Sequence, residues 1–148
     1  FHAPPIEEAR RHAQAHGLSD RVRFEVATAK DVADGGFDLV TMYDCLHDMG
    51  DPRGCAEHMR SILAPGGTWM IVEPIAGDSP EQNFNPVGRL YYNASTMICV
   101  PTSLDQEVGE GLGAQAGEAR LAQIVREAGF DQVRRATEGP FNMVLEAV

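Results

Sequence analysis

Two short apolar runs, separated by an amphipathic segment, constrain the fold of this chain more than any other feature. FDLVTM at 37–42 and TWMIVEP at 68–74 lie between turn signals, as buried strands do. Residues 53–63 place apolar side chains at helical spacing, with Pro52 near the start and Gly66 and Gly67 past the end. This strand, helix, strand order predicts two parallel strands joined by a helix.

The flanking segments extend this alternation across the whole sequence. Their patterns predict helices at about 5–16 and 86–99, a helix in GEARLAQIVREAGF (117–130) that Gly129 closes, and a strand at 22–26. QVRRATE and FNMVLEAV, joined by Gly139 and Pro140, predict a terminal antiparallel hairpin. We therefore predict an α/β fold, a three-layer sandwich whose mostly parallel sheet has an antiparallel edge. It would form one domain over 1–148, with an insertion at about 75–117.

Charge and cysteine content narrow the function classes. The chain has 12 basic and 22 acidic side chains, a net charge of -10, which disfavours binding to nucleic acid or to an anionic membrane surface. Three cysteines are an odd number, which fits a reducing compartment better than a disulfide framework. No apolar stretch is long enough for a spanning helix, and the first residues do not read as a signal peptide. We expect a cytoplasmic protein.

Three segments together resemble a known family: FDLVTMYDCLHDMGDP, RSILAPGGTWMIVEP and LAQIVREAGFDQV. They resemble the class I, Rossmann-like S-adenosylmethionine-dependent methyltransferases, nearest to small-molecule O-methyltransferases and related bacterial methyltransferases. In that family, a glycine-rich turn and an acidic residue on the first two strands hold the cofactor. Both would lie upstream of Phe1, so the sequence reads as an N-terminally truncated domain. The resemblance implies methyl transfer to a small-molecule acceptor, at oxygen, and is compatible with a homodimer.

The resemblance also implies where S-adenosylmethionine would bind. Residues just after the missing acid pack on the adenine ring, residues after the next strand face its amino group, and residues after FDLVTM lie beneath the sulfonium. The corresponding positions here are Phe1 and His2; Thr28, Ala29 and Lys30; and Tyr43, Asp44 and Cys45. Many relatives carry an aspartate where this chain has Thr28, and a neutral hydroxyl accepts a hydrogen bond less strongly.

His47 in the LHD segment aligns with the histidine that removes the acceptor proton in plant phenol O-methyltransferases. A neutral hydroxyl is a poor nucleophile, and histidine titrates close to neutral pH, which suits a general base. Asp48, Asp44 or Glu73 could orient the imidazole, and the sequence leaves that choice open. The alternative interpretation is that His47 only fills the loop that enters the next helix.

Three other groups of residues have a structural interpretation that is stronger than the functional one. GLGAQA at 111–116 fits a dinucleotide pattern, but no predicted strand precedes it, so we interpret it as a loop. Cys45, His47, Cys55 and His58 do not have a common zinc spacing, so no metal site is predicted. Tyr91 and Tyr92 could contact an aromatic acceptor, but an aromatic stripe is more often core.

Two other function classes remain open from the sequence. One is a catalytically incomplete methyltransferase-like module that binds a ligand or dimerises, because a sheet without its first strands exposes an edge. The other is a nucleotide-dependent oxidoreductase of similar architecture, which would need a glycine fingerprint directly after a strand.

Overall fold

A computed structural model describes residues 2–148 and groups the chain into two compact units that divide between Ala33 and Asp34. The first unit contains helix α1 (Ala3–Ala15) and a 3₁₀ turn (Ala29–Asp31). Prolines in its first turn suit α1, because their missing N–H groups would have no intrahelical partner there. The helix predicted at 5–16 is confirmed.

The strand predicted at 22–26 is wrong, because residues 22–28 have no regular secondary structure. Alternating apolar and polar residues form a strand only where a neighbouring strand takes up the backbone hydrogen bonds. Two backbone groups of this segment have partners outside any sheet: the Arg10 guanidinium donates to the Phe24 carbonyl at 2.6 Å, and Val22 N–H donates to the Leu18 carbonyl.

The second unit is built on a four-stranded mixed sheet with strand order β1-β2-β4-β3. Its strands are β1 (Phe37–Tyr43), β2 (Leu63–Pro74), β3 (Val133–Glu138) and β4 (Asn142–Ala147). β1 and β2 are parallel, whereas β4 runs antiparallel to both β2 and β3. The α/β class, the parallel pair and the terminal hairpin are confirmed. Among the residues that the structure describes, the sheet has one parallel pair and two antiparallel ones.

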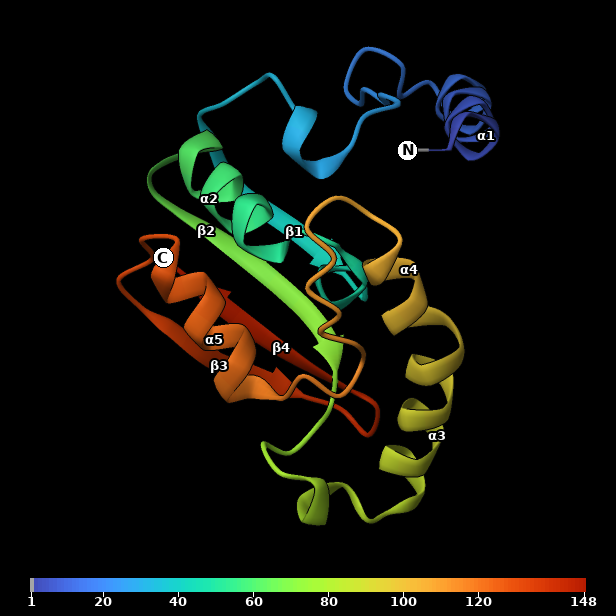
Figure 1. Ribbon diagram of the computed structural model, residues 1–148. Coiled ribbons are helices and arrows are strands. Elements are labelled where there is room, and N and C mark those ends of the chain that lie inside the picture. The colour runs from blue at the N-terminus through green and yellow to red at the C-terminus, as the bar shows by residue number, and fades with distance from the viewer. Residues whose placement is uncertain (1) are drawn as a thin grey trace. The chain divides into compact units, whose positions relative to one another are not determined.

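Helices α2 (Pro52–Ile62) and α5 (Glu118–Glu127) lie on the same face of this sheet and contact each other (Figure 1). A longer helical column runs from α3 (Pro86–Ala94) through a π-helical turn (Ser95–Cys99) into α4 (Val100–Leu104). The helix predicted at 86–99 is thus confirmed and extends further. None of the helices in the described part of the chain is long and apolar enough to cross a membrane.

The core lies between the sheet and α2 and α5. Strand β2 supplies its centre, because Trp69 and Ile71 are both fully buried on the side that faces the helices. Trp69 packs against Phe130, with ring centroids 5.5 Å apart. Since side chains alternate along a strand, Glu73 continues the same buried row and is also 0% exposed. The strand therefore carries a carboxylate to the end of the core.

Asp51 provides a stability test for the start of α2. Its side chain caps the helix by accepting a hydrogen bond from the Gly54 N–H at 2.8 Å. We expect Asp51→Ala to lower the free energy of unfolding by about 1 kcal/mol, because the N–H loses its acceptor. Asp51→Asn keeps an acceptor oxygen, so its free energy of unfolding should be close to that of the wild-type protein. Urea denaturation monitored by circular dichroism measures both, and equal loss in the two variants would contradict the capping role.

Candidate active site

The candidate site lies where β1 and β2 end side by side. Open α/β sheets bind ligands outside the carboxyl ends of their parallel strands, and this is such an edge. After β1 the chain turns sharply: Asp44 has a φ of +46°, a left-handed conformation that is uncommon for residues other than glycine. The turn leads into a 3₁₀ turn, η2 (Leu46–Asp48), that carries His47. Strained backbone of this kind often accompanies functional sites.

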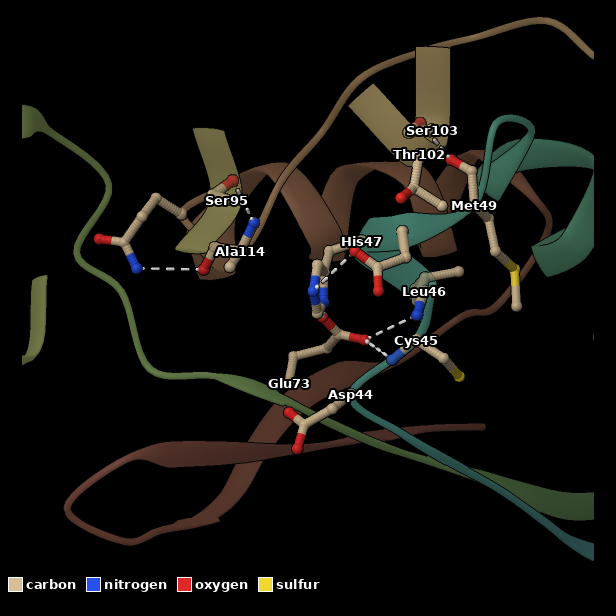
Figure 2. Close-up of polar contacts among 12 residues, drawn as sticks. Asp44, Cys45, Leu46, His47, Met49, Glu73, Ser95, Thr102, Ser103 and Ala114 are labelled. Carbon is tan, nitrogen blue, oxygen red and sulfur yellow. Dashed lines mark hydrogen bonds and ion pairs between the residues drawn. The ribbon is translucent and has the colours of Figure 1, made fainter. Parts of the chain in front are cut away.

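Glu73, near the end of β2, organises the loop after β1 (Figure 2). One carboxylate oxygen, Oε1, accepts hydrogen bonds from the backbone N–H groups of Cys45 (3.3 Å) and Leu46 (2.9 Å). The other, Oε2, lies 2.5 Å from Nδ1 of His47. A buried carboxylate is costly unless it is paired and hydrogen-bonded, and Glu73 has all three partners in place.

His47 is itself buried, with 4% of its surface exposed. Contact with Glu73 fixes the ring and favours the proton on Nδ1, so that the neutral imidazole presents its lone pair at Nε2. Burial alone would lower the pKa of His47. The hydrogen bond to Glu73 and its charge, with smaller contributions from Asp48 and Asp44, outweigh burial and raise this pKa above its usual value.

The structure distinguishes among the three acids that could orient His47. Glu73 contacts Nδ1, whereas Oδ1 of Asp48 lies on the other side of the ring, 3.2 Å from Nε2. The Asp44 carboxylate accepts a hydrogen bond from the Asn142 side chain at 2.7 Å and acts on His47 only through its charge. Glu73 is therefore the group that holds the imidazole. The alternation of β2 could have singled it out from the sequence.

GLGAQA at 111–116 forms a loop that contacts the His47 turn, and the sequence did not predict these contacts. Gly113 N–H donates to the His47 carbonyl at 3.2 Å, and Ala114 N–H donates to Oγ of Ser95 at 3.0 Å. GLGAQA follows helix α4 and a turn rather than a strand, as expected for a loop and not for a dinucleotide fingerprint.

Gly113 offers a test of how tightly this loop packs. Its φ is +71°, and an added Cβ would overlap Oγ of Ser95 and lie 2.8 Å from Cγ2 of Val100. Gly66 has a similar φ of +77° but open space around it, so Gly66→Ala measures the backbone strain alone, about 1–2 kcal/mol. We expect Gly113→Ala to cost about 1–3 kcal/mol more because of overpacking. Thermal unfolding of both variants measures the difference. An equal loss of stability in the two variants would show that the loop shifts to accommodate the added methyl group.

The residues expected to hold the cofactor fall in both units. Phe1 lies outside the described residues. His2 is exposed in the first unit, where Thr28 precedes the 3₁₀ turn that contains Ala29 and Lys30. Tyr43, Asp44 and Cys45 follow one another at the end of β1 in the second unit. Tyr43 is 62% exposed, and burial, followed by the charge of Glu73, raises the pKa of the Cys45 thiol to about 11.

The structure also places the cysteines and tyrosines that the sequence analysis considered. All three cysteines are free thiols, and Cys55 is buried in α2. The ligand set considered from the sequence is not the one that forms a cluster: among the described residues, His47 is grouped instead with Asp48 and Cys99. Tyr91 donates from its hydroxyl to the Phe141 carbonyl at 3.0 Å, whereas Tyr92 is 40% exposed.

Comparison with curated proteins shows similarity to two methyltransferases. The chain is 33% identical over 92 residues to the demethylmenaquinone methyltransferase of Thermus thermophilus, a match that covers 62% of this chain and 41% of that protein. It is 35% identical over 73 residues to the tRNA 5-carboxymethoxyuridine methyltransferase of Escherichia coli, covering 47% and 28% of the two chains. The matches thus span less than half the length of these relatives.

Solved structures and a family model also show similarity to methyltransferases. An O-methyltransferase family protein from Burkholderia thailandensis superposes with a TM-score of 0.68 at 25% identity, covering 95% of this chain and 40% of that one. NcsB1, an O-methyltransferase from neocarzinostatin biosynthesis solved with S-adenosyl-L-homocysteine and 1,4-dihydroxy-2-naphthoic acid, has the same TM-score of 0.68 at 21% identity, covering 97% and 39%. The family model described as "Methyltransferase domain" matches residues 2–129. The chain therefore belongs to the methyltransferase domain family.

Proposed function

We propose that the protein containing this chain transfers a methyl group from S-adenosylmethionine to an oxygen atom of a small molecule, with His47 as general base. The observation that carries the proposal is the Glu73 contact. It holds Nδ1 of a buried histidine and leaves Nε2 as the acceptor at the carboxyl ends of two parallel strands. Family membership supports the methyl-transfer reaction itself.

In this proposal, the base acts in one proton transfer. His47 would take the proton of the acceptor hydroxyl at Nε2 while the oxygen bonds to the methyl carbon; the carbon–sulfur bond of the donor breaks, and S-adenosylhomocysteine leaves. The imidazolium that results is stabilised by the Glu73 carboxylate at Nδ1, and by the charges of Asp48 and Asp44. General base catalysis of this kind is worth about 10²–10⁴-fold in rate. The remaining acceleration comes from alignment of donor and acceptor.

S-adenosylmethionine supplies a methyl group on a positively charged sulfur. The residues proposed to bind it are Phe1, His2, Thr28, Ala29, Lys30, Tyr43, Asp44 and Cys45. The end of β1 fits a cationic ligand, because Asp44 places a carboxylate there and Tyr43 offers an exposed aromatic ring. Thr28 is already engaged, since its hydroxyl donates to Asp31 at 2.5 Å. Its oxygen can still accept a hydrogen bond from an adenine amino group.

The acceptor is proposed to be a small hydroxylated molecule. NcsB1 was solved with a dihydroxynaphthoic acid, and the net charge of -10 favours a small acceptor over a polyanion. One of the relatives is named as a tRNA methyltransferase, so RNA is the competing class of acceptor. Methyl-labelled S-adenosylmethionine incubated with 1,4-dihydroxy-2-naphthoic acid, simple phenols or tRNA distinguishes the two. Label in tRNA alone would contradict a small-molecule acceptor.

Calorimetric titration of S-adenosylhomocysteine tests the cofactor directly. The titration uses the 148-residue chain and a version extended upstream to the length of its relatives. We expect binding to the extended form, because the family's glycine-rich turn and acidic residue belong to that part. Binding by neither form would contradict the enzyme assignment and favour a methyltransferase-like binding or dimerisation module.

A further inference from the structure

Three potential metal ligands from two parts of the fold converge beside Nε2 of His47. Each of His47, Asp48 and Cys99 offers one ligand atom, and all three atoms lie within 4.8 Å of one another. His47 and Asp48 belong to η2, whereas Cys99 ends the π-helical turn after α3. Cys99 is 51 positions from Asp48 and 52 from His47, so no local spacing motif indicates the cluster. π-helical turns occur frequently at functional sites.

One oxygen of the Asp48 carboxylate, Oδ1, has no hydrogen-bond donor in this cluster. This atom is buried and accepts no hydrogen bond, although it lies 3.2 Å from Nε2 of His47. With Glu73 holding the proton of the neutral ring at Nδ1, Nε2 and Oδ1 face each other as two lone-pair acceptors. Two such atoms at this distance require a positive charge between or beside them, either a proton or a cation.

Glu73 completes the surroundings that metal-binding histidines usually have. Such a histidine commonly donates its second ring N–H to a carboxylate, which orients the ring and makes the ligating nitrogen more basic. Glu73 has this relation to His47 at 2.5 Å and is anchored by two backbone N–H groups. The ring is therefore held with Nε2 directed toward Asp48, as a metal ligand would need.

We propose that His47, Asp48 and Cys99 form a binding site for a zinc-like divalent cation, with one coordination position left open. Imidazole nitrogen, carboxylate oxygen and thiolate sulfur are the three ligand types that zinc takes in proteins. In a tetrahedral site these atoms lie about 3.3–3.8 Å apart. The His47 Nε2 and Asp48 Oδ1 atoms, 3.2 Å apart, are within about 0.1 Å of this spacing, and Cys99 has to move closer by about 1 Å at most.

Two costs set the strength of this site. Burial, followed by interactions with Asp48, raises the pKa of the Cys99 thiol to about 11, so the metal must displace a proton from sulfur. The ion must also take the Nε2 lone pair that the proposed methyl transfer uses. Cation binding and methyl transfer therefore exclude each other, and the site is regulatory rather than catalytic.

Cobalt titration tests the site without any enzymatic assay. The 148-residue chain, cleared of metal with EDTA and exchanged into buffer, is titrated with Co²⁺ and followed by absorbance. We expect a thiolate-to-cobalt charge-transfer band in the near ultraviolet and displacement of the cobalt by Zn²⁺. Cys99→Ser should abolish the band, and Asp48→Asn should weaken cobalt binding. Glu73→Gln should weaken it by about 10–100-fold through the orientation of His47.

Matched controls separate this site from the other thiols. Cys45→Ser and Cys55→Ser should both keep the band, because neither sulfur belongs to the cluster. A band that survives Cys99→Ser, or no cobalt binding by wild-type chain with native circular dichroism, would overturn the proposal. The part of the proposal that makes the site regulatory rests on the proposed function, but the site itself does not. Cobalt binding by a protein that transfers no methyl group when it is free of metal would contradict only the function, whereas methyl transfer without cobalt binding would contradict only the site.

Discussion

Replacing His47 by glutamine is expected to lower kcat for an alcohol or phenol acceptor by about 10²–10⁴-fold, the range that a lost general base accounts for. Glutamine is similar in size and polarity but cannot take up the proton. The KM for S-adenosylmethionine should change little, because the imidazole acts on the acceptor and not on the cofactor. Steady-state kinetics in metal-free buffer, using a phenol that the wild-type protein methylates, measure both constants.

His16→Gln is the matched control for this substitution. His16 is exposed at the end of α1, and its Nδ1 contacts the His12 carbonyl of its own helix. We expect wild-type kinetics from it. Should His47→Gln retain the full rate on a neutral hydroxyl acceptor while it binds S-adenosylhomocysteine normally, the general-base role would be wrong. His47 would then only shape the loop, which was the competing interpretation of the sequence.

Much of the second unit could be predicted because local patterns decide it. The apolar run over β2, the helical spacing of α2 with Pro52 at its start, and the turn between β3 and β4 each depend on residues close in sequence. The strand at 22–26 failed for the opposite reason. Its alternation was present, but a strand also needs a neighbour, and no sequence pattern reports whether one is available.

In the candidate site, too, the features set by nearby residues could be predicted, whereas those set by distant residues could not. His47 was singled out because the LHD segment resembles the one that carries the proton-accepting histidine of plant phenol O-methyltransferases. Its partner Glu73 lies 26 positions away and was only one of three options, although the alternation from Trp69 through Ile71 places it on the buried face. Cys99 could not be found at all: the π-helical turn sets its direction, and that turn is an extra-residue irregularity that a helical pattern does not reveal.

Glu73→Gln is expected to impair both folding and methyl transfer, because one carboxylate serves three donors. Glutamine has a single acceptor oxygen, so its NH₂ group must face either the two backbone N–H groups or Nδ1 of His47. A buried donor left unpaired costs about 1–3 kcal/mol of unfolding free energy. Loss of the fixed tautomer should lower kcat by about 100-fold or more, as in catalytic triads whose aspartate is replaced by asparagine.

The tautomer itself distinguishes positioning of His47 from a merely structural role. In ¹⁵N NMR spectra of the neutral ring, wild-type His47 should carry its proton on Nδ1, and Glu73→Gln should shift the population toward Nε2–H. Glu146→Gln is the matched control, because this carboxylate lies on neighbouring strand β4 and pairs with Arg134 at the surface. A surface pair contributes only about 0–1 kcal/mol, so stability and tautomer should stay near wild type. If Glu73→Gln lost stability but kept both the tautomer and kcat, Glu73 would support the loop alone, and another group would have to hold the base.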